Sequence, residues 1–495
     1  MKTKKVMISM SILVVLFVTT FSIFYFSKGS LTEPTANGQT PLKEEEMPRF
    51  REASVHDPSV IKVDDTFYVF GSHLAAAKST DLLNWQQIST SVNETNPLIP
   101  NVFEQLAETF EWAQTKTLWA PDVVQLEDGR FYMYYNACEG SSPRSALGVA
   151  VADHIEGPYQ DLGIFLKSGM WGEPSENGQI YDPRVHPNVV DPHTFFDEDG
   201  QLWMVYGSYS GGIFILRIDP KTGFPFPDQG YGKRLIGGNH SRIEGAYILF
   251  NPQTNYYYMY LSFGGLDAVG GYNIRVVRSK NPDGPYLDAE ENEMVNVKSN
   301  PSKPLFDDVT IKPFGVKLMG NFEFIKRYED GPARRNGYVS PGHNSAYYDK
   351  ETGQSFIIFH TRFPRRGEQH QIRVHQMFMN SQGWPVVTPH RYAGETISKV
   401  TTSMVVGDYQ LINHGKDISA EIKNSVLVTL NKNQTISGEV TGTWSLKGDF
   451  MVELTVDGKI YDGVFHKQWD ESLKSYVMTF SALSNEGISI WGSQQ

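Results

Sequence analysis

The chain has 495 residues but a single cysteine, Cys138. One cysteine excludes an intrachain disulfide and a metal cluster held by several thiolates, so packing must stabilise the fold. Clusters of basic residues are also missing, and the formal net charge is −12 at pH 7. A nucleic acid or an anionic membrane surface requires a clustered basic face, so we expect neither as a partner. Nothing in the sequence implies a stable protein partner.

Long stretches of helical periodicity are missing as well, which argues against a fold that alternates helices with parallel strands. Aromatic residues, in contrast, are abundant, with 25 Tyr, 29 Phe and 9 Trp. Such side chains suit pleated, half-buried strands, and they also suit stacking against sugar rings. The composition therefore favours an all-β fold.

The N-terminus has a basic segment followed by an apolar one. Lys2, Lys4 and Lys5 precede an apolar run over residues 6–26 that only hydroxyl residues interrupt. This pattern predicts a signal peptide or a membrane anchor over residues 1–29, and Ser27 and Gly29 fit a cleavage site. Residues 30–47 are rich in Thr, Pro, Gly and Glu, which is typical of a flexible linker. We expect a secreted protein, with anchoring at the outer face of the membrane as the alternative.

A repeated unit organises the middle of the chain: a polar residue, a short apolar strand, a turn and an aromatic strand. The turns contain Asp-Gly or longer loops with Gly, Asn or Pro, so each unit indicates a β-hairpin. A further strand follows each hairpin and, with one more in the connecting segment, makes a four-stranded blade. The first residues of the five units are Asp57, Asp122, Asp191, Glu244 and His343.

Five blades closed around an axis predict a five-bladed β-propeller over residues 48–393. The repeat then stops, and alternating apolar positions beside the turn Asp457-Gly458 predict a small β-sandwich or β-barrel domain over residues 394–495. The innermost strand of each blade lines the central channel. We therefore expect the five first residues to converge near one end of the axis.

Three of these first residues carry the chemistry that glycoside hydrolysis needs. A protonated acid must serve the leaving oxygen, and a carboxylate must activate water on the opposite face of the sugar. Glu244 is the candidate acid, because its neighbours Ile243 and Ala246 are apolar and burial raises the pKa of a carboxyl group. Asp57 is the candidate base. Asp191 would lie near Glu244 and help to keep that acid protonated.

The motifs HDPSV, LWAPDV, VVDPHTFFDEDG, SRIEGAYI and SPGHNSA resemble glycoside hydrolase family 43, above all its endo-α-1,5-L-arabinanases with an additional C-terminal β domain. The resemblance implies an inverting reaction on plant cell-wall arabinan and arabino-oligosaccharides. In that reaction Asp57 is the general base, Glu244 the general acid and Asp191 the residue that modulates the pKa and orientation of the acid. It also implies that His343 ligates an axial metal ion, usually Ca²⁺.

Purely structural roles are alternatives to several of these functional assignments. Asp-Pro is a common turn dipeptide, so Asp57 alone would be structural more often than catalytic. Asp122 either hydrogen-bonds the substrate or holds its own loop. A buried core histidine is the alternative for His343, because Ca²⁺ prefers oxygen ligands. For substrate contacts we expect Asn188, Ser208, Tyr209, Ser210, the loop Gly140, Ser141 and Ser142, and, for stacking on a furanose ring, Trp119 and Phe70, with ordinary core packing as the alternative for both rings.

Other functions remain open on the sequence alone. An exo-acting α-L-arabinofuranosidase or a β-xylosidase of the same family would carry the same three carboxylates, and a non-catalytic carbohydrate-binding propeller would tolerate the loss of any of them. A retaining fructan hydrolase is disfavoured because its second-blade RDP and Glu-Cys motifs are missing. For an inverting enzyme we expect Asp57 and Glu244 to stand roughly 6.5–9.5 Å apart, against about 5–5.5 Å for a retaining one.

Overall fold

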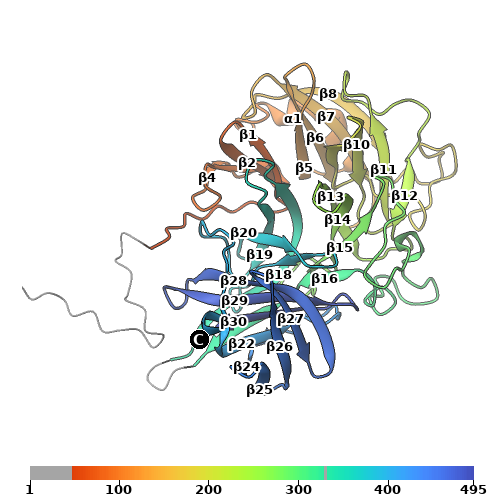
Figure 1. The fold of residues 1–495 in the computed structure, drawn as a ribbon. Helices are drawn as coiled ribbons and strands as arrows, with labels where there is room; N and C mark the ends of the chain where they lie inside the picture. The colour runs from red at the N-terminus through yellow and green to blue at the C-terminus, as the bar shows by residue number, and fades with distance from the viewer. Residues whose placement is uncertain (1–46, 328–331) are drawn as a thin grey trace, which may run out of the picture. The chain divides into compact units, whose positions relative to one another are not determined.

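The five sequence repeats form five antiparallel sheets in the computed structural model, which describes residues 47–327 and 332–495 (Figure 1). The expected leader and linker over residues 1–47 lie almost wholly outside these ranges. Within the described ranges, no helix is both long enough and apolar enough to cross a bilayer.

Each sheet contributes four strands to a blade, in chain order from the axis outwards. The first blade contains β1 (Ser59–Val63), β2 (Thr66–Gly71), β3 (Ala75–Ser79) and β4 (Gln86–Ser89). The second contains β5 (Trp119–Gln125), β6 (Phe131–Cys138), β7 (Ser145–Ala152) and β8 (Gln160–Lys167). The third contains β9 (His193–Phe196), β10 (Leu202–Tyr206), β11 (Ile213–Ile218) and β12 (Lys233–Ile236). The fourth contains β13 (Ile243–Asn251), β14 (Tyr256–Phe263), β15 (Asn273–Ser279) and β16 (Val316–Met319). The fifth contains β18 (Arg334–Tyr348), β19 (Ser355–Arg362), β20 (His370–Met379) and β21 (Pro385–Val387).

The innermost strands contact one another in a ring, from β1 through β5, β9, β13 and β18 back to β1. A cluster of buried apolar side chains fills the space between each neighbouring pair of blades, including the pair formed by the first and the fifth. Strands such as β6 and β7 are buried along their whole length, because blades cover both of their faces. This arrangement confirms the five-bladed propeller.

The fifth blade departs from the repeat. Its inner strand β18 is 15 residues long, and the part before His343 pairs with an additional strand, β17 (Phe322–Lys326). In turn β17 pairs in parallel with β23 (Lys423–Asn424), so one sheet runs from the fifth blade into the C-terminal part of the chain. The sequence repeat gave no sign of this extension.

The C-terminal region is a closed β-barrel, which decides between the two expected alternatives. Its core is continuous with that of the fourth and fifth blades, because Trp491 of the barrel packs against Phe322 of β17. The barrel strands are β22 (Gly407–Asn413), β24 (Val426–Leu430), β25 (Thr435–Gly438), β26 (Gly442–Lys447), β27 (Met451–Val456), β28 (Lys459–Asp470), β29 (Ser475–Ser484) and β30 (Ser489–Gln494). Among the described residues, the short helices are α1 (Val102–Gln105), α2 (Ala107–Ala113), α3 (Thr402–Val405), η2 (Ser72–Leu74) and η3 (Met294–Asn296).

Candidate active site

Three of the five first residues line one small cavity where the inner strands begin. Asp57 directly precedes the first blade, Asp191 the third, and His343 lies within β18; all three border a space of about 20 Å³. That volume has room for about one water molecule. Glu244 lies beside this cavity, because the next residue, Gly245, is part of its wall.

An unusual backbone conformation accompanies this convergence. Asp57, Asp191, Gly245 and His343 all have positive φ values, of 58°, 56°, 60° and 42°. Non-glycine residues rarely adopt this region, and such strain clusters at functional sites. Gly245 is required there for a second reason, since a Cβ atom would stand 3.1 Å from the His343 ring. The strands β13 and β18 also shift register beside Glu244 and His343.

Asp57 is surrounded by hydrogen-bond donors. Its carboxylate accepts from Ser72 Oγ at 2.5 Å and contacts His56 Nδ1 at 2.8 Å and His343 Nδ1 at 3.1 Å. Burial alone would raise the pKa of Asp57, but the two imidazoles outweigh burial and hold that pKa well below its usual value. The Asp57 carboxylate is therefore ionised at neutral pH, as a general base must be.

The pKa of Glu244 is shifted in the opposite direction from that of Asp57. Burial is the main cause that raises the pKa of its carboxyl group, although hydrogen bonds from Ser208 Oγ at 2.6 Å and Tyr272 Oη at 2.8 Å oppose the shift. Two carboxyl groups in one site whose environments move their pKa values apart are the arrangement that assigns an acid and a base. Asp57 and Glu244 form such a pair.

Asp191 accepts a hydrogen bond from the Gly245 N–H at 3.3 Å, next to Glu244 in the chain. Burial raises the pKa of Asp191 to about 7, and the negative charges of Glu244 and Asp57 add to the rise while His343 opposes it. His343 balances these acids: burial would lower the pKa of its imidazole, but the carboxylates raise it to about 10. The site thus collects three carboxyl groups around one cation.

Asp122 belongs to the scaffold in this geometry. One of its oxygens accepts from Ser59 Oγ in the first blade, and the other accepts from the N–H and Oγ1 of Thr194 in the third. Asp122 is buried in β5 of the second blade, so its carboxylate ties three blades together. Of the two alternatives for Asp122, the contacts favour a residue that holds the structure.

The expected substrate contacts differ in their surroundings. Ser208 binds Glu244, as described above. Tyr209 is half-buried and donates from its hydroxyl group to Gly264 O, whereas Asn188 is buried and accepts from Ser145 Oγ. Ser210 is buried, Trp119 is half-buried and packs against Gly140, and Ser141 and Ser142 follow in a solvent-accessible loop.

Of the two alternatives for Phe70, stacking on a sugar and ordinary core packing, the structure favours the core. Its side chain is fully buried in the apolar cluster between the first and second blades. Alternate side chains of β2 point to opposite faces of the sheet, and in a propeller a neighbouring blade covers each face. No face of the Phe70 ring is available to a sugar.

Sequence reasoning missed several residues that contact the three acids. His56 and Ser72 bind Asp57, and Tyr272 binds Glu244. His360 Nδ1 accepts a hydrogen bond from the Asp57 N–H, and its ring stacks on His56 at 3.7 Å between centroids. His56 was recognisable as the neighbour of Asp57 in HDP, but Tyr272, just before β15, and His360, in β19, come close to the acids only through the fold.

Most of the exposed large apolar side chains in the described ranges lie in three loops. The first loop, residues 168–192, leads to β9, and the second, residues 264–272, joins β14 to β15. The third, residues 297–315, precedes β16, and its Phe306 packs against Tyr209 with ring centroids 5.8 Å apart. All three loops adjoin the end of the strands where the acids converge. Their exposed residues are Trp171, Ile180, Val185, Leu266, Val269, Leu305, Phe306 and Val309.

Two sets of side chains could hold a cation. One ligand atom each from His56, Asp57 and His360 lies within 4.8 Å of the other two, and His360 Nδ1 already accepts a hydrogen bond from the Asp57 N–H. The second set lines the axial cavity and includes His343 and Asn344. Both amide atoms of Asn344 are buried without a hydrogen-bond partner among the described residues, and an amide oxygen is a ligand that Ca²⁺ accepts. This second set fits a hard cation better.

Comparison with known proteins agrees with this geometry. Residues 50–307 match the description "Glycosyl hydrolases family 43", and residues 389–492 match a C-terminal lipocalin-like domain. The chain is 65% identical to the extracellular endo-alpha-(1->5)-L-arabinanase 2 of Bacillus subtilis (strain 168), over 90% of this chain and 94% of that protein. An endo-1,5-alpha-L-arabinanase from Thermotoga petrophila RKU-1 has a crystal structure with a TM-score of 0.86 at 54% identity, covering 90% of this chain and 100% of that one. A family 43 glycoside hydrolase from Bacillus licheniformis gives a TM-score of 0.87 at 67% identity, covering 90% and 99%. The family match spans more than half of the chain, and the chain belongs to glycoside hydrolase family 43.

Proposed function

We propose that this protein hydrolyses α-1,5-L-arabinofuranosidic linkages inside arabinan chains with inversion at the anomeric carbon. The observation that carries the proposal is the axial pairing of an ionised Asp57 with a Glu244 whose pKa is raised. Relatives that share 65% and 54% of their residues with this chain are named endo-arabinanases, which supports arabinan as the substrate and endo action over the exo-acting and xylosidase alternatives.

In this mechanism Asp57 removes a proton from water as the water attacks the anomeric carbon, while Glu244 donates its proton to the departing glycosidic oxygen. Ser208 and Tyr272 fix the Glu244 carboxyl group, and His56 and Ser72 fix that of Asp57. Asp191 adds negative charge beside Glu244, which disfavours ionisation of the acid before the sugar arrives. All three functional carboxyls are buried, so few waters compete for their protons.

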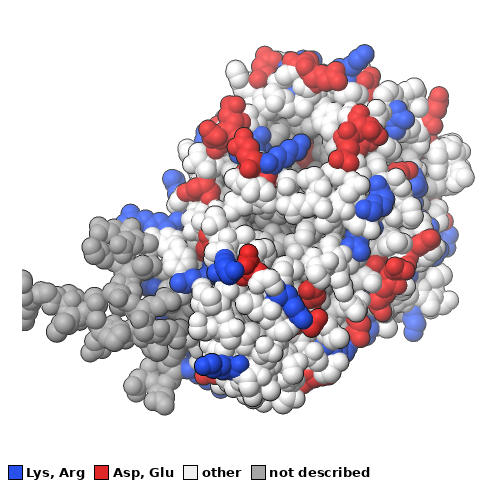
Figure 2. Space-filling model, viewed as in Figure 1, with Lys and Arg blue, Asp and Glu red and all other residues white. Residues whose placement is uncertain are grey.

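The loops around the axial end support a polymeric substrate. Exposed apolar side chains on three loops offer stacking surface for several sugar units beyond the one that is cleaved. On the face in Figure 2, acidic and basic side chains are interspersed, which suits a neutral polysaccharide. A binding propeller without activity would have no need for carboxyl groups whose pKa values are moved apart.

We propose that His343, with the neighbouring Asn344, holds one Ca²⁺ ion at the axial cavity. Bound there, the ion would supply fixed positive charge facing the three carboxyl groups. The unpartnered Asn344 amide supports this assignment, and so do the three buried carboxyl groups that converge on the same cavity.

We also propose that the protein is secreted, with residues 48–393 as the catalytic domain and 394–495 as the C-terminal domain. The basic and apolar N-terminal segments support export, and relatives are named extracellular. An N-terminus near Gly29 or Ser30 in the exported protein would distinguish a cleaved signal from a retained anchor.

The deciding experiment is incubation with linear arabinan, with the chain-length distribution followed over time. We expect intermediate oligosaccharides to appear first, and proton NMR of the first product to show inversion. Release of single arabinose units from the start would favour the exo-acting alternative. Cleavage of aryl xylosides but not of arabinan would favour the xylosidase, and no cleavage of either would leave a binding propeller.

A further inference from the structure

A second cavity of about 450 Å³ lies far from the axial acids, beside the fifth blade. Its walls come from the turn between β18 and β19, from β20, from the segment that joins the propeller to the barrel, and from Phe450 of the barrel. The volume lies within the range of small-molecule sites in proteins. Nothing in the proposed reaction uses it.

The cavity is at the opposite end of the blades from the carboxyl groups. Glu244 begins β13, and Gln253, which borders the cavity, lies in the turn after that strand ends at Asn251. At about 3.3 Å per residue, the strand alone places the two roughly 20 Å apart. A ligand in this cavity therefore does not contact the residues that break the bond.

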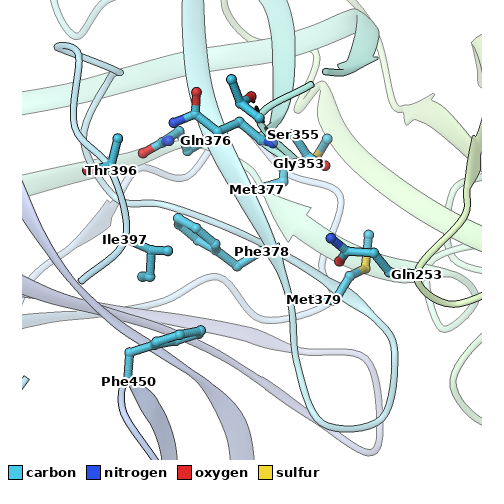
Figure 3. A pocket seen from close by; sticks show the side chains of 12 residues that line it. Gln253, Gly353, Ser355, Gln376, Met377, Phe378, Met379, Thr396, Ile397 and Phe450 are labelled. Carbon is cyan, nitrogen blue, oxygen red and sulfur yellow. Dashed lines mark hydrogen bonds between the residues drawn. The ribbon is translucent and has the colours of Figure 1, made fainter. Parts of the chain in front are cut away.

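The lining is neutral. It combines amide, hydroxyl and thioether groups with aromatic rings, and no charged side chain among the described residues borders it. Figure 3 shows Phe378, Ile397 and Phe450 grouped on one side of the space, and Gln253 beside Met379 on the other. Sugars present apolar C–H faces to such rings and hydroxyl groups to such amides. A charged metabolite would find no counter-charge here.

Part of the polar wall is held in place. Gln354 and Gln376 both donate to the carbonyl oxygen of Glu395, at 3.3 and 3.1 Å, and Gln376 Oε1 contacts His466 Nε2 at 3.1 Å. These bonds fix the orientation of two amide groups before any ligand binds, which reduces the entropy lost on binding. Gln253 is solvent-exposed, and no hydrogen bond engages its side chain within the described ranges. It remains available to a ligand.

We propose that this cavity is a second saccharide-binding site, which takes an uncharged arabinan segment and keeps the polymer attached while the axial site cuts elsewhere on it. The substrate class rests on the proposed function. Two sites on one chain that bind one polymer raise the effective concentration of the second contact, so attachment should matter for long chains and not for short ones.

The test compares polymer with oligomer. Thr396 is exposed at the edge of the cavity, so Thr396→Trp should fill the space without disturbing a core, and Phe450→Ala should remove one stacking wall. Phe196→Ala is the matched control, because Phe196 is an exposed phenylalanine that does not border the cavity. Kinetics on linear arabinan and on arabinotriose, affinity electrophoresis in arabinan-containing gels and melting temperatures are measured for all four proteins.

We expect both cavity variants to raise KM for linear arabinan about three- to tenfold and to migrate faster through arabinan gels. Their kcat/KM on arabinotriose should match that of the parent and of Phe196→Ala. Unchanged polymer kinetics and migration in Thr396→Trp, with an unchanged melting temperature, would overturn the proposal. Equal losses on polymer and trimer would also overturn it, because they would place the effect at the axial site.

The two proposals fail separately in this design. If the parent cleaves arabinan and Thr396→Trp behaves like it, only the second site is wrong. If the parent cleaves no arabinan, the proposed function is wrong, and gel retardation that Thr396→Trp abolishes would still establish the cavity as a saccharide site.

Discussion

Two of the regions that bury charged side chains treat those charges differently. At the axial end, Asp57, Asp191 and Glu244 share one cationic partner, His343, and oppose one another's ionisation. Where the fifth blade meets the barrel, Lys326 donates to Asp470, to Ser493 Oγ and to Gln494 O, at 2.7, 2.9 and 2.6 Å. All three ammonium protons have acceptors. In the first region the buried carboxyl groups repel one another, whereas in the second every donor of the buried ammonium group has an acceptor.

The difference distinguishes a region that serves catalysis from a region that stabilises the fold. Carboxyl groups that disfavour one another's ionisation reduce the stability of the fold, and they are useful only where protons must move. A buried cation whose three donors are all hydrogen-bonded links the barrel to the propeller, and its protons stay in those hydrogen bonds. Substitutions in the two regions should therefore affect different measurements.

Removing the axial carboxylates should have the largest effect, and it should fall on activity. We expect Asp57→Asn to lower kcat by about 10³- to 10⁴-fold on every substrate, because water activation is needed whatever the leaving group. Glu244→Gln should lose as much on arabinan but far less on aryl arabinosides, whose leaving groups need little protonation. Steady-state kinetics on both substrates check this.

Melting temperatures provide the control for these two variants. Both should stay within a few degrees of the parent, since an amide of equal size replaces a poorly solvated carboxyl group. Equal losses of Glu244→Gln on both substrates would mean that Glu244 is not the general acid.

Breaking the satisfied pair should affect stability instead. Lys326→Met leaves the Asp470 carboxylate buried without its cation, which costs about 3–5 kcal/mol of the free energy of unfolding. Denaturation in urea measures the loss. The double variant Lys326→Met/Asp470→Leu should regain most of it, because a buried pair replaced by apolar groups is often neutral. A single variant as stable as the parent would contradict the comparison.

The sequence predicted the repeated hairpins of this structure. It did not predict the features that depend on which other blade or strand packs against a given strand. Turn chemistry and alternation are local, so the hairpins from Asp57 to His343 were recognisable in the chain. For Phe70 both alternatives stayed open, because its sequence neighbours do not reveal that a second blade covers its face. The long β18 and its partner β17 were missed because they interrupt the repeat instead of continuing it.

The candidate site shows the same division. Asp57, Asp191 and Glu244 were found because they begin repeated units, and the position of a residue within a repeat can be read from the sequence alone. Tyr272 and His360 begin no unit: Tyr272 reaches Glu244 across the fourth blade, and His360 of the fifth blade meets Asp57 of the first only because the blades close into a ring. Asp122 occupies the same register yet bonds three blades together, so register alone does not distinguish scaffold from chemistry.

The junction region should also be the acid-sensitive one. Burial is the main cause that lowers the pKa of His375 to about 3 and those of His390 and His466 to about 4. Each is neutral in the fold but takes up a proton near pH 6.5 when unfolded. The unfolded state then binds more protons, so stability should fall as the pH drops from about 6.5 to 4, by up to about 3 kcal/mol for each histidine.

Urea midpoints between pH 7 and pH 4 measure this effect. His466→Gln should flatten part of the slope, because an amide can still meet Gln376 but does not titrate. A slope that persists unchanged would assign the acid sensitivity to other groups.

The smallest expected effect returns to the axial end, at a residue that carries no charge. Trp171 is 49% exposed in the loop before Asp191, and Tyr181 packs against its ring edge-to-face with centroids 5.3 Å apart. Tyr181 is itself anchored through its hydroxyl group, which donates to Pro187 O at 3.2 Å. A large ring fixed in one orientation yet open to solvent is suited to stack on a sugar, and one such contact contributes about 1 kcal/mol.

We therefore expect Trp171→Ala to raise KM for linear arabinan about fivefold, to leave kcat unchanged, and to leave the melting temperature within a degree or two. Trp171→Phe should recover most of the loss because stacking needs a ring and not the indole N–H. Phe196→Ala, an exposed phenylalanine in the third blade, controls for the removal of any exposed aromatic residue. If Trp171→Ala lowered kcat as well, the loop would act on the acids rather than on the polymer, and the separation of binding from chemistry at the axial end would not hold.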